Sequence, residues 1–244
     1  MKAKILKLGT SCNNRCYFCS EDGTDYEMDF EKLSAVIKTA RTGCEQIILT
    51  GKEPTIYPRI IELLHTAKES GYKVITIVTN GRMFAYQMFT REAVLAGLTD
   101  VLVALHAHTP EIHDRITSVA QSFRQTLQGI NCLQKVSATM SPFNLVSISA
   151  GTVIVEENYA YLPQIVDLVA SVGIQNIFFI RCKPDGAGPD FAKIRPHLSR
   201  ALDLSRQHGI NAFTKGFSDD ELGDYRSFRY EQFLQTHPVL TPEL

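Results

Sequence analysis

The chain alternates short hydrophobic runs, rich in β-branched residues, with longer stretches in which hydrophobic residues recur every three or four positions. The short runs predict six buried strands, at residues 5–8, 46–50, 73–79, 100–106, 145–155 and 176–181. The stretches between them predict amphipathic helices, and a seventh helix is expected near residues 197–208. Strands that alternate with helices in this way form parallel βαβ units. We therefore expect an α/β fold, a partial (β/α)6 barrel of the TIM type with parallel strands.

The pattern also predicts how the chain is divided and where two helices begin. Residues 1–210 are expected to form the core domain, and the more polar and aromatic-rich residues 211–244 a short C-terminal extension that packs on it. Asp29 is placed to cap the first helix, and Ser122 with Gln125 has the spacing of a capping box.

The polar residues best suited to bind a ligand or take part in catalysis follow the predicted strands. In parallel α/β folds, ligands bind beyond the carboxyl ends of the strands. The segments at those ends are residues 10–25, 51–55, 79–81, 106–108 and 181–186. They bring Asn80, His106 and Arg181 to one rim, together with the cysteines near the N-terminus.

Cys12, Cys16 and Cys19 stand within eight residues, directly after the first predicted strand. A closed structural zinc site or an ordinary iron–sulfur cluster takes four protein ligands, and no fourth cysteine or Cys/His pair lies nearby. Three cysteines can hold three irons of a cubane cluster and leave the fourth iron open to a small molecule. A zinc knuckle or an oxidation-sensitive loop is the alternative.

Composition excludes several classes of protein. The chain has 244 residues, 44% of them hydrophobic, and a formal net charge of −1 without a lysine or arginine block, which does not support nucleic-acid binding. No apolar run approaches the roughly 20 residues that a membrane span needs, and the first residues lack the pattern of a signal peptide. We therefore expect a cytoplasmic protein with no membrane contact, whose clustered cysteines bind a metal rather than form disulfides.

The turn after the second strand reads Gly51, Lys52, Glu53, Pro54. Its backbone groups and carboxylate suit the amine and carboxylate of a small zwitterion, and the proline keeps Glu53 out of helical geometry. This Gly-x-Glu-Pro turn, together with Cys-x3-Cys-x2-Cys and an aromatic residue before the last cysteine, resembles the radical S-adenosylmethionine (radical SAM) superfamily over about residues 4–183.

The resemblance implies a 4Fe-4S cluster on Cys12, Cys16 and Cys19, with S-adenosylmethionine on the fourth iron. It implies that Phe18 lies against the adenine and that the turn formed by Gly51, Lys52, Glu53 and Pro54 holds the methionyl amino group. One-electron reduction would then yield a 5′-deoxyadenosyl radical that abstracts a hydrogen atom from the substrate. A reduced flavodoxin or ferredoxin is the expected electron donor, and an oxygen-sensitive enzyme is implied.

Two positions depart from the family pattern. Lys52 replaces the second glycine of the usual Gly-Gly-Glu-Pro turn, which requires a negative φ at Lys52. Ala104 stands where a serine near the ribose or carboxylate is common, which leaves His106 or Asn80 to contact the ribose. Arg181 is a candidate partner for a carboxylate of the cofactor or the substrate.

Several candidates have a structural interpretation beside the functional one. Asn80 is either a site residue or a turn residue, and at most one of His106 and His108 points inward, because they alternate along a strand end. Cys182 is either a hydrogen-atom donor to a substrate radical or a packed cysteine at a strand end. The remaining residues have structural interpretations. Cys44 and Cys132 are expected to be small core residues, and His113 and Asp114 capping or surface groups. The aromatic residues of the tail are expected to pack on the core rather than form a docking surface or lid; they are Phe213, Phe217, Tyr225, Phe228, Tyr230 and Phe233.

The function expected is radical modification of a small molecule or a peptide. An activating enzyme that installs a glycyl radical on a partner protein is the alternative, and a non-catalytic iron–sulfur protein fits less well because it would need four ligands and no Gly-x-Glu-Pro turn. No cysteine follows Cys182, so a cysteine-rich extension for auxiliary clusters is not expected. Nor is a cobalamin-binding domain expected, and the chain resembles a minimal core of the family.

Overall fold

The computed structural model describes residues 2–19, 28–140, 145–182 and 188–230. Its centre is a sheet of seven parallel strands that lie side by side in chain order. They are β1 (Ala3–Lys7), β2 (Gln46–Thr50), β3 (Val74–Thr79), β4 (Asp100–Ala104), β5 (Ser147–Ile154), β6 (Asn176–Arg181) and β7 (Asn211–Lys215). Because β1 and β7 are the two edges of the sheet, the barrel is open between them.

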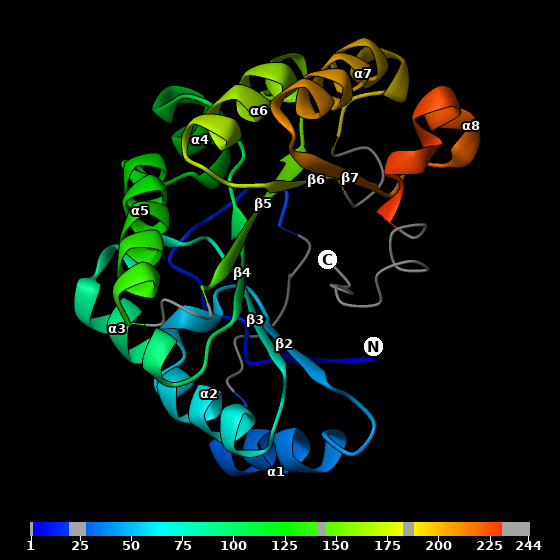
Figure 1. Ribbon diagram of the computed structural model, residues 1–244. Coiled ribbons are helices and arrows are strands. Elements are labelled where there is room, and N and C mark those ends of the chain that lie inside the picture. The colour runs from blue at the N-terminus through cyan, green and yellow to red at the C-terminus, as the bar shows by residue number, and fades with distance from the viewer. Residues whose placement is uncertain (1, 20–27, 141–144, 183–187, 231–244) are drawn as a thin grey trace.

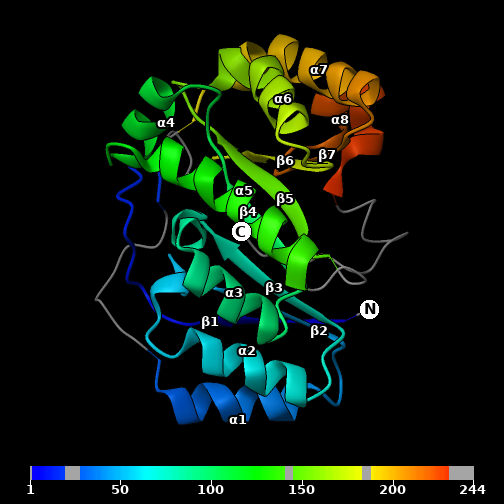
Figure 2. The same ribbon diagram turned by 60° about the vertical axis from the view of Figure 1, so that its left-hand side comes forward.

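Helices cover the convex outer face of this curved sheet (Figure 1). They are α1 (Phe30–Ala40), α2 (Ile60–Glu69), α3 (Gln87–Leu95), α4 (Pro110–Thr117), α5 (Ser122–Met140), α6 (Leu162–Ser171), α7 (Phe191–His208) and α8 (Asp219–Leu222). Short 3-10 turns stand at η1 (Pro54–Ile56), η2 (Arg82–Ala85), η3 (Tyr159–Tyr161) and η4 (Gly223–Phe228). Figure 2 shows α1, α2, α3 and α5 following one another along the same side of the sheet.

The main hydrophobic core lies between the sheet and these helices. Ile47 and Leu49 of β2, and Ile75 and Ile77 of β3, are almost fully buried. They belong to one cluster with residues of α1 and α2, among them Leu33, Ile37, Leu63 and Leu64. Alternate strand residues therefore face the helices, and the residues between them face the concave side of the sheet.

A smaller cluster covers part of the concave side and includes the end of the described chain. It consists of Leu102, Phe178, Phe213 and Tyr230. The rings of Phe178 and Phe213 stack with their centroids 4.8 Å apart, and Tyr230 meets Phe178 edge-on at 5.5 Å. The prediction that the tail aromatics pack on the core is confirmed for Phe213 and Tyr230, and Phe217, Tyr225 and Phe228 pack against the main cluster. Phe233 lies outside the described residues.

The predicted fold class is confirmed, and the number of strands is corrected from six to seven. The missed strand, β7, begins where the C-terminal extension was expected to begin. It is only five residues long, with polar residues at both ends, so its pattern resembles that of a connecting segment. Its register pairs Phe213 with Phe178. The extension thus starts inside the sheet, and the division at residue 210 stays a prediction.

The two predicted helix starts have different outcomes. Asp29 caps α1 as expected, since its Oδ1 accepts from the Lys32 N–H at 3.1 Å. The capping box at Ser122 is wrong, because Ser122 is already the first residue of α5 and its hydroxyl donates to Asp114 Oδ1 at 2.8 Å. Asp114 also accepts from the Phe123 N–H at 2.8 Å, so the cap comes from α4. Asp114 is therefore a capping group, whereas His113 is buried and is neither a cap nor a surface group.

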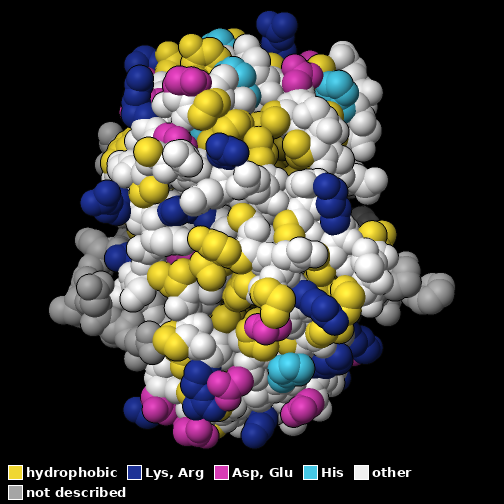
Figure 3. Space-filling view, turned by 90° about the vertical axis from the view of Figure 1, so that its left-hand side faces the viewer, with side chains coloured by type: hydrophobic (Ala, Val, Ile, Leu, Met, Phe, Trp, Pro, Cys, Tyr) yellow, Lys and Arg dark blue, Asp and Glu magenta, His cyan; other side chains and the backbone are white. Residues whose placement is uncertain are grey.

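The outer face carries charged side chains mainly above and below a central area with more hydrophobic ones (Figure 3). Tyr86 and Met88, at the start of α3, are 61% and 70% exposed. Within the described part of the chain, no helix has the length and apolar character that crossing a membrane requires.

The turn after β2 lies directly against the end of β1. Gly51 has a φ of 100°, and a Cβ built on it would lie 2.7 Å from the Gly9 carbonyl oxygen and 3.1 Å from the Leu8 nitrogen. Only glycine fits such an approach. The next residue, Lys52, has a φ of 36°, so the negative φ expected for it is wrong. Lys52 occupies the left-handed region, where a side chain costs about 1 kcal/mol or more.

We predict that Gly51→Ala destabilises the fold by about 2 to 4 kcal/mol, because it adds a backbone clash to an unfavourable φ. Chemical denaturation of the metal-free protein measures this difference. Gly43→Ala is the matched control: a Cβ at Gly43 meets nothing within 4 Å, so its change should stay within about 0.5 kcal/mol. Equal unfolding midpoints for the two variants would show that the turn does not need a glycine.

Candidate functional site

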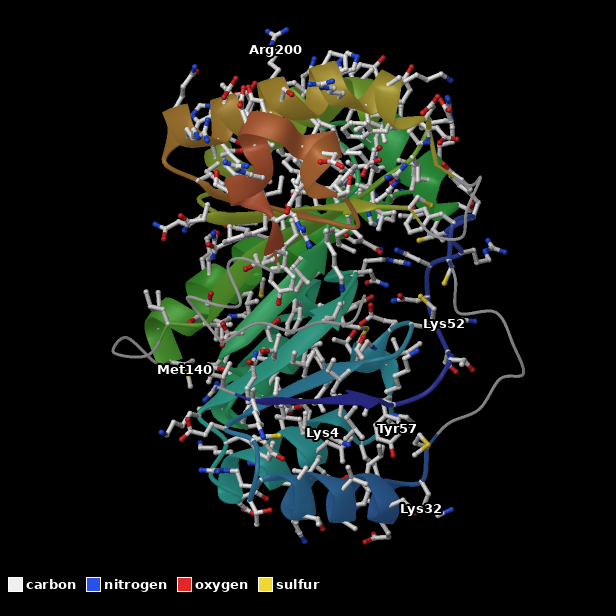
Figure 4. The ribbon with its side chains drawn as sticks, turned by 90° about the vertical axis from the view of Figure 1, so that its right-hand side faces the viewer. Lys4, Lys32, Lys52, Tyr57, Met140 and Arg200 are labelled. Atoms are coloured by element: carbon white, nitrogen blue, oxygen red, sulfur yellow. The ribbon has the colours of Figure 1, made fainter. Side chains whose placement is uncertain are left out.

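A cavity of about 860 Å³ opens at the carboxyl ends of the strands. Of the candidate residues found in the sequence, nine line it: Cys12, Cys16, Cys19, Phe18, Gly51, Lys52, Asn80, His106 and Arg181. Figure 4 shows Lys52 on the side where β1 and β2 end and Met140, the last residue of α5, on the opposite side. Glu53, Pro54 and Cys182 are not among the lining residues. The cavity has the volume of a site for a cofactor together with a small substrate.

The three cysteines lie close enough for their charges to interact. Burial, and then the thiolate charges of Cys12 and Cys19, raise the pKa of Cys16 to about 12. Burial is also the main cause of the raised pKa of Cys12, while the Asn14 N–H, which donates to Cys12 Sγ at 3.3 Å, opposes it. Three thiolates in one pocket repel one another, so they need a bound cation to be stable together. The donor set therefore fits a cationic iron–sulfur cluster.

A single metal ion fits this loop less well. Among the described residues, no group of three or more His, Cys, Asp or Glu side chains is placed to hold one metal ion. The three cysteines are free thiols, with no disulfide between them. Thiolates that share a pocket but do not converge on one point are suited to a centre with several metal atoms.

Arg82, in the turn after β3, fixes the backbone of the cysteine loop. Its Nη1 donates to the Asn13 carbonyl oxygen and, at 2.8 Å, to Asn14 Oδ1, while its Nε donates to Gln125 Oε1 at 2.6 Å. The Asn80 amide adds a hydrogen bond of 2.6 Å to Asn13 Oδ1. Arg82 was not predicted as a site residue, since nothing in an arginine after Thr-Asn-Gly distinguishes it from a surface residue.

Glu53 holds the turns after β2 and β3 together. Its Oε1 accepts from the N–H and hydroxyl of Thr55 and, at 2.7 Å, from the Thr79 hydroxyl, and its Oε2 accepts from the Asn80 N–H at 2.7 Å. The Glu53 N–H donates to the Ser11 carbonyl in the cysteine loop at 3.1 Å. Burial raises the pKa of Glu53, and these hydrogen bonds oppose the rise. Its observed contacts are within the protein, and its contact with an amino group stays a prediction.

His106 lines the cavity, and His108, two residues later, does not. The His106 ring meets Phe18 edge-on at 5.1 Å and stacks on His113 at 5.8 Å. His108 lies against Tyr161 instead, at 5.2 Å. The prediction that at most one of the two histidines faces the barrel is confirmed.

His106 is a neutral imidazole near pH 7. Burial, with a smaller effect of His113, lowers its pKa to about 3. Its Nδ1 accepts from the Val153 N–H at 3.4 Å, so the proton is on Nε2, which can donate. Ala104 also lines the cavity and has no side-chain donor. His106 and Asn80 are therefore the candidates for a polar contact from this part of the cavity.

The two candidates at the end of β6 have different surroundings. Arg181 lines the cavity, and its Nη1 forms an ion pair with Glu221 at 2.6 Å. Cys182 is 8% exposed in an apolar cluster with Ile116 and Val155, and burial raises its pKa. These contacts agree with a packed cysteine, and hydrogen donation by Cys182 stays a prediction. The rest of the predicted strand-end segment 181–186, from residue 183 on, lies outside the described residues.

Cys44 and Cys132 lie outside the site. Both are half-buried and pack against the main hydrophobic core. Their prediction as small core residues is confirmed.

We predict that Arg82→Met weakens iron binding by about tenfold, the loss typical of removing an outer partner of a metal ligand. Iron and sulfide per chain after anaerobic reconstitution measure this, and the spectrum of the reduced cluster should broaden as the loop loses its fixed geometry. Arg82→Lys should recover only part of the binding, because lysine cannot reproduce the planar fork. Arg124→Met, at an exposed position near the start of α5, is the control. Iron binding as strong in Arg82→Met as in Arg124→Met would contradict this role.

We predict that the free energy of unfolding falls as the pH drops from 6.5 to 4, in part because of His106. The folded pKa of His106 is lowered to about 3, so the unfolded chain binds a proton that the folded chain does not. A fully linked proton contributes a slope of about 1.4 kcal/mol per pH unit. In urea unfolding of the metal-free protein, His106→Gln should flatten this slope, whereas His65→Gln, at an exposed position of α2, should not. A wild-type slope in His106→Gln would refute the assignment.

The model of the family described as the radical SAM superfamily matches residues 6–169. A probable GTP 3′,8-cyclase of Saccharolobus islandicus (strain M.14.25 / Kamchatka #1) is 30% identical over 181 residues, which are 72% of this chain and 56% of that protein. A protein of the same description from Sulfurisphaera tokodaii is 26% identical over 72% of this chain and 55% of its own length. The chain thus spans little more than half the length of these relatives.

Solved structures share the fold at low sequence identity. Streptococcus suis SuiB bound to S-adenosylmethionine matches with a TM-score of 0.70 at 15% identity, over 96% of this chain and 55% of that one. Methylornithine synthase (PylB) matches with a TM-score of 0.61 at 14% identity, over 99% of this chain and 83% of that one.

The family match includes the cysteine loop, the Gly51 turn and the strands that carry them. It also accounts for three cysteines that share one cavity. The chain belongs to the radical SAM superfamily, and it is an enzyme whose cofactors are a 4Fe-4S cluster and S-adenosylmethionine.

Proposed function

We propose that this radical SAM enzyme abstracts a hydrogen atom from a small molecule or peptide bound in the cavity at the carboxyl ends of the strands. The observation that carries the proposal is that Cys12, Cys16 and Cys19 share this cavity with the turn after β2 and the ends of the later strands. A cofactor on the cysteines and a substrate on the strands would therefore meet in one enclosed space.

Cys12, Cys16 and Cys19 would each bind one iron of the cluster, which leaves the fourth iron to the amino group and carboxylate of S-adenosylmethionine. When bound there, the cluster would supply the one-electron chemistry that cleaves the sulfonium of S-adenosylmethionine. A reduced flavodoxin or ferredoxin would deliver that electron. The chain's own part is to hold the cysteine loop through Arg82 and Asn80.

We expect three residues to orient the cofactor. Phe18 lies between the apolar cluster of Val153, Val155 and Cys182 and the cavity, where an adenine ring would find an apolar surface. His106 Nε2 can donate to a ribose oxygen. Gly51 lines the cavity, where its turn would hold the methionyl amino group.

A second candidate is a cyclisation of a purine nucleotide. It is favoured by the relatives described as probable GTP 3′,8-cyclases, which are 30% identical over 181 residues. The chain covers only 56% of that relative's length, so this more specific activity needs a direct test. Anaerobic incubation with GTP, S-adenosylmethionine and dithionite decides it: GTP must be consumed in step with 5′-deoxyadenosine formation.

We predict that the anaerobically reconstituted protein cleaves S-adenosylmethionine to 5′-deoxyadenosine with dithionite and that Cys16→Ala reduces the rate to background. With only two cysteine ligands left, the protein no longer holds the cluster stably. Chromatography of 5′-deoxyadenosine measures the rate. Cys132→Ala, which changes a half-buried cysteine outside the cavity, is the control and should keep the wild-type rate. Undiminished cleavage by Cys16→Ala would sink the proposal.

A further inference from the structure

Lys52 has a backbone conformation that a glycine would adopt more easily. Its φ is 36°, in the left-handed region where a side chain is unfavourable. At this position of the turn the family commonly has a glycine. Lys52 also lines the cavity that contains the three cysteines. A side chain that is kept at an unfavourable φ beside such a cavity is a candidate for a function of its own.

The backbone places Lys52 beside Cys12. The Glu53 N–H donates to the Ser11 carbonyl oxygen at 3.1 Å. The peptide group that follows Lys52 is therefore hydrogen-bonded to the peptide group that precedes Cys12, and the two side chains start from neighbouring points. Burial raises the pKa of the Cys12 thiol, and the Lys52 charge acts against this rise, which agrees with the placement from the backbone.

Several groups near Cys12 carry negative charge. After burial, the charges of Glu53 and Cys19 also raise the pKa of Cys12. One-electron reduction of a cluster on these cysteines adds one more negative charge to the same region. The reduction potential of a cluster depends on the charge around it, so the negative groups oppose reduction and a nearby cation favours it.

The Lys52 ammonium is the better placed of two cations close to the cysteines. Arg15, within the cysteine loop, also lines the cavity, but its side chain is exposed, so solvent screens its charge. Lys52 is half-buried. Within the described part of the chain, its ammonium forms no hydrogen bond or ion pair with a protein group. The charge is therefore available to a negative group bound in the cavity.

We propose that the Lys52 ammonium stabilises the reduced form of the cluster held by Cys12, Cys16 and Cys19, and so raises the reduction potential of that cluster. One electron passes from the external donor to the cluster, and no proton needs to be taken up, because the fixed ammonium balances the added charge. This inference goes beyond the proposed function, since it concerns the cluster and does not depend on the substrate.

A redox titration of the reconstituted protein tests the inference, without S-adenosylmethionine and followed by the electron paramagnetic resonance signal of the reduced cluster. Lys52→Gln removes the charge but keeps a side chain at the left-handed φ, and Lys52→Gly removes both. Each should lower the ratio of reduced to oxidised cluster at a given solution potential about tenfold, which is about 59 mV for a one-electron couple. Lys52→Arg, which keeps the charge, should keep the wild-type potential.

Lys32→Gln is the matched control. Lys32 is an exposed residue of the outer helix α1 and does not line the cavity (Figure 4). Its variant should have the wild-type potential, and a shift equal to that of Lys52→Gln would show a general effect of net charge and overturn the proposal. Iron and sulfide per chain are measured for every variant, so that proteins with the same cluster content are compared.

The other outcomes also have a defined meaning. A wild-type potential in Lys52→Gln overturns the proposal. So does a lowered potential in Lys52→Gly alone, because the conformation of the turn, and not the charge, would then set the potential. If both neutral variants lose the cluster, the charge supports cluster binding rather than reduction, and the proposal is again overturned. Formation of 5′-deoxyadenosine by the wild type, measured on the same preparation, tests the proposed function separately.

Discussion

The buried carboxylate of Glu53 is the interaction on which the site depends. A carboxylate inside a protein is costly unless it is fully hydrogen-bonded, and Glu53 accepts four hydrogen bonds from Thr55, Thr79 and Asn80. Those donors come from two different turns, so satisfying the charge fixes the ends of β2 and β3 relative to each other. Through Asn80 and the neighbouring Arg82, the same constraint reaches the cysteine loop.

This arrangement explains how a loop with few hydrophobic contacts keeps a defined shape. The loop is held by polar contacts of Asn13 and Asn14 with Arg82. Gly51 allows the second turn to lie against β1, and Lys52 accepts an unfavourable φ in the same turn. The unfavourable φ of Lys52 and the buried carboxylate of Glu53 both lie next to the cysteine loop, as is common at functional sites. The free energy cost of both is offset by the stability of the sheet and its outer helices.

Much of the fold could be predicted from the sequence because hydrophobic periodicity is a local signal. Strand β6 was predicted with its observed bounds, and β2 likewise, since both are continuous apolar runs in a parallel sheet. Strand β7 was missed because its three buried residues, Ala212, Phe213 and Thr214, are too few to establish a period. The cap of α5 was wrong for a related reason: Asp114 is eight residues before Ser122, beyond the reach of a local capping rule.

The sequence by itself determined the type of chemistry. The spacing of Cys12, Cys16 and Cys19 and the Gly-x-Glu-Pro turn depend only on neighbours along the chain, and they identified the family, its cofactors and several of the residues that line the cavity. The tertiary structure alone decided which groups support these residues. Arg82 is 69 residues from Asn13 and belongs to no motif, so its contact with the cysteine loop arises only when parallel strands bring their carboxyl ends to one edge.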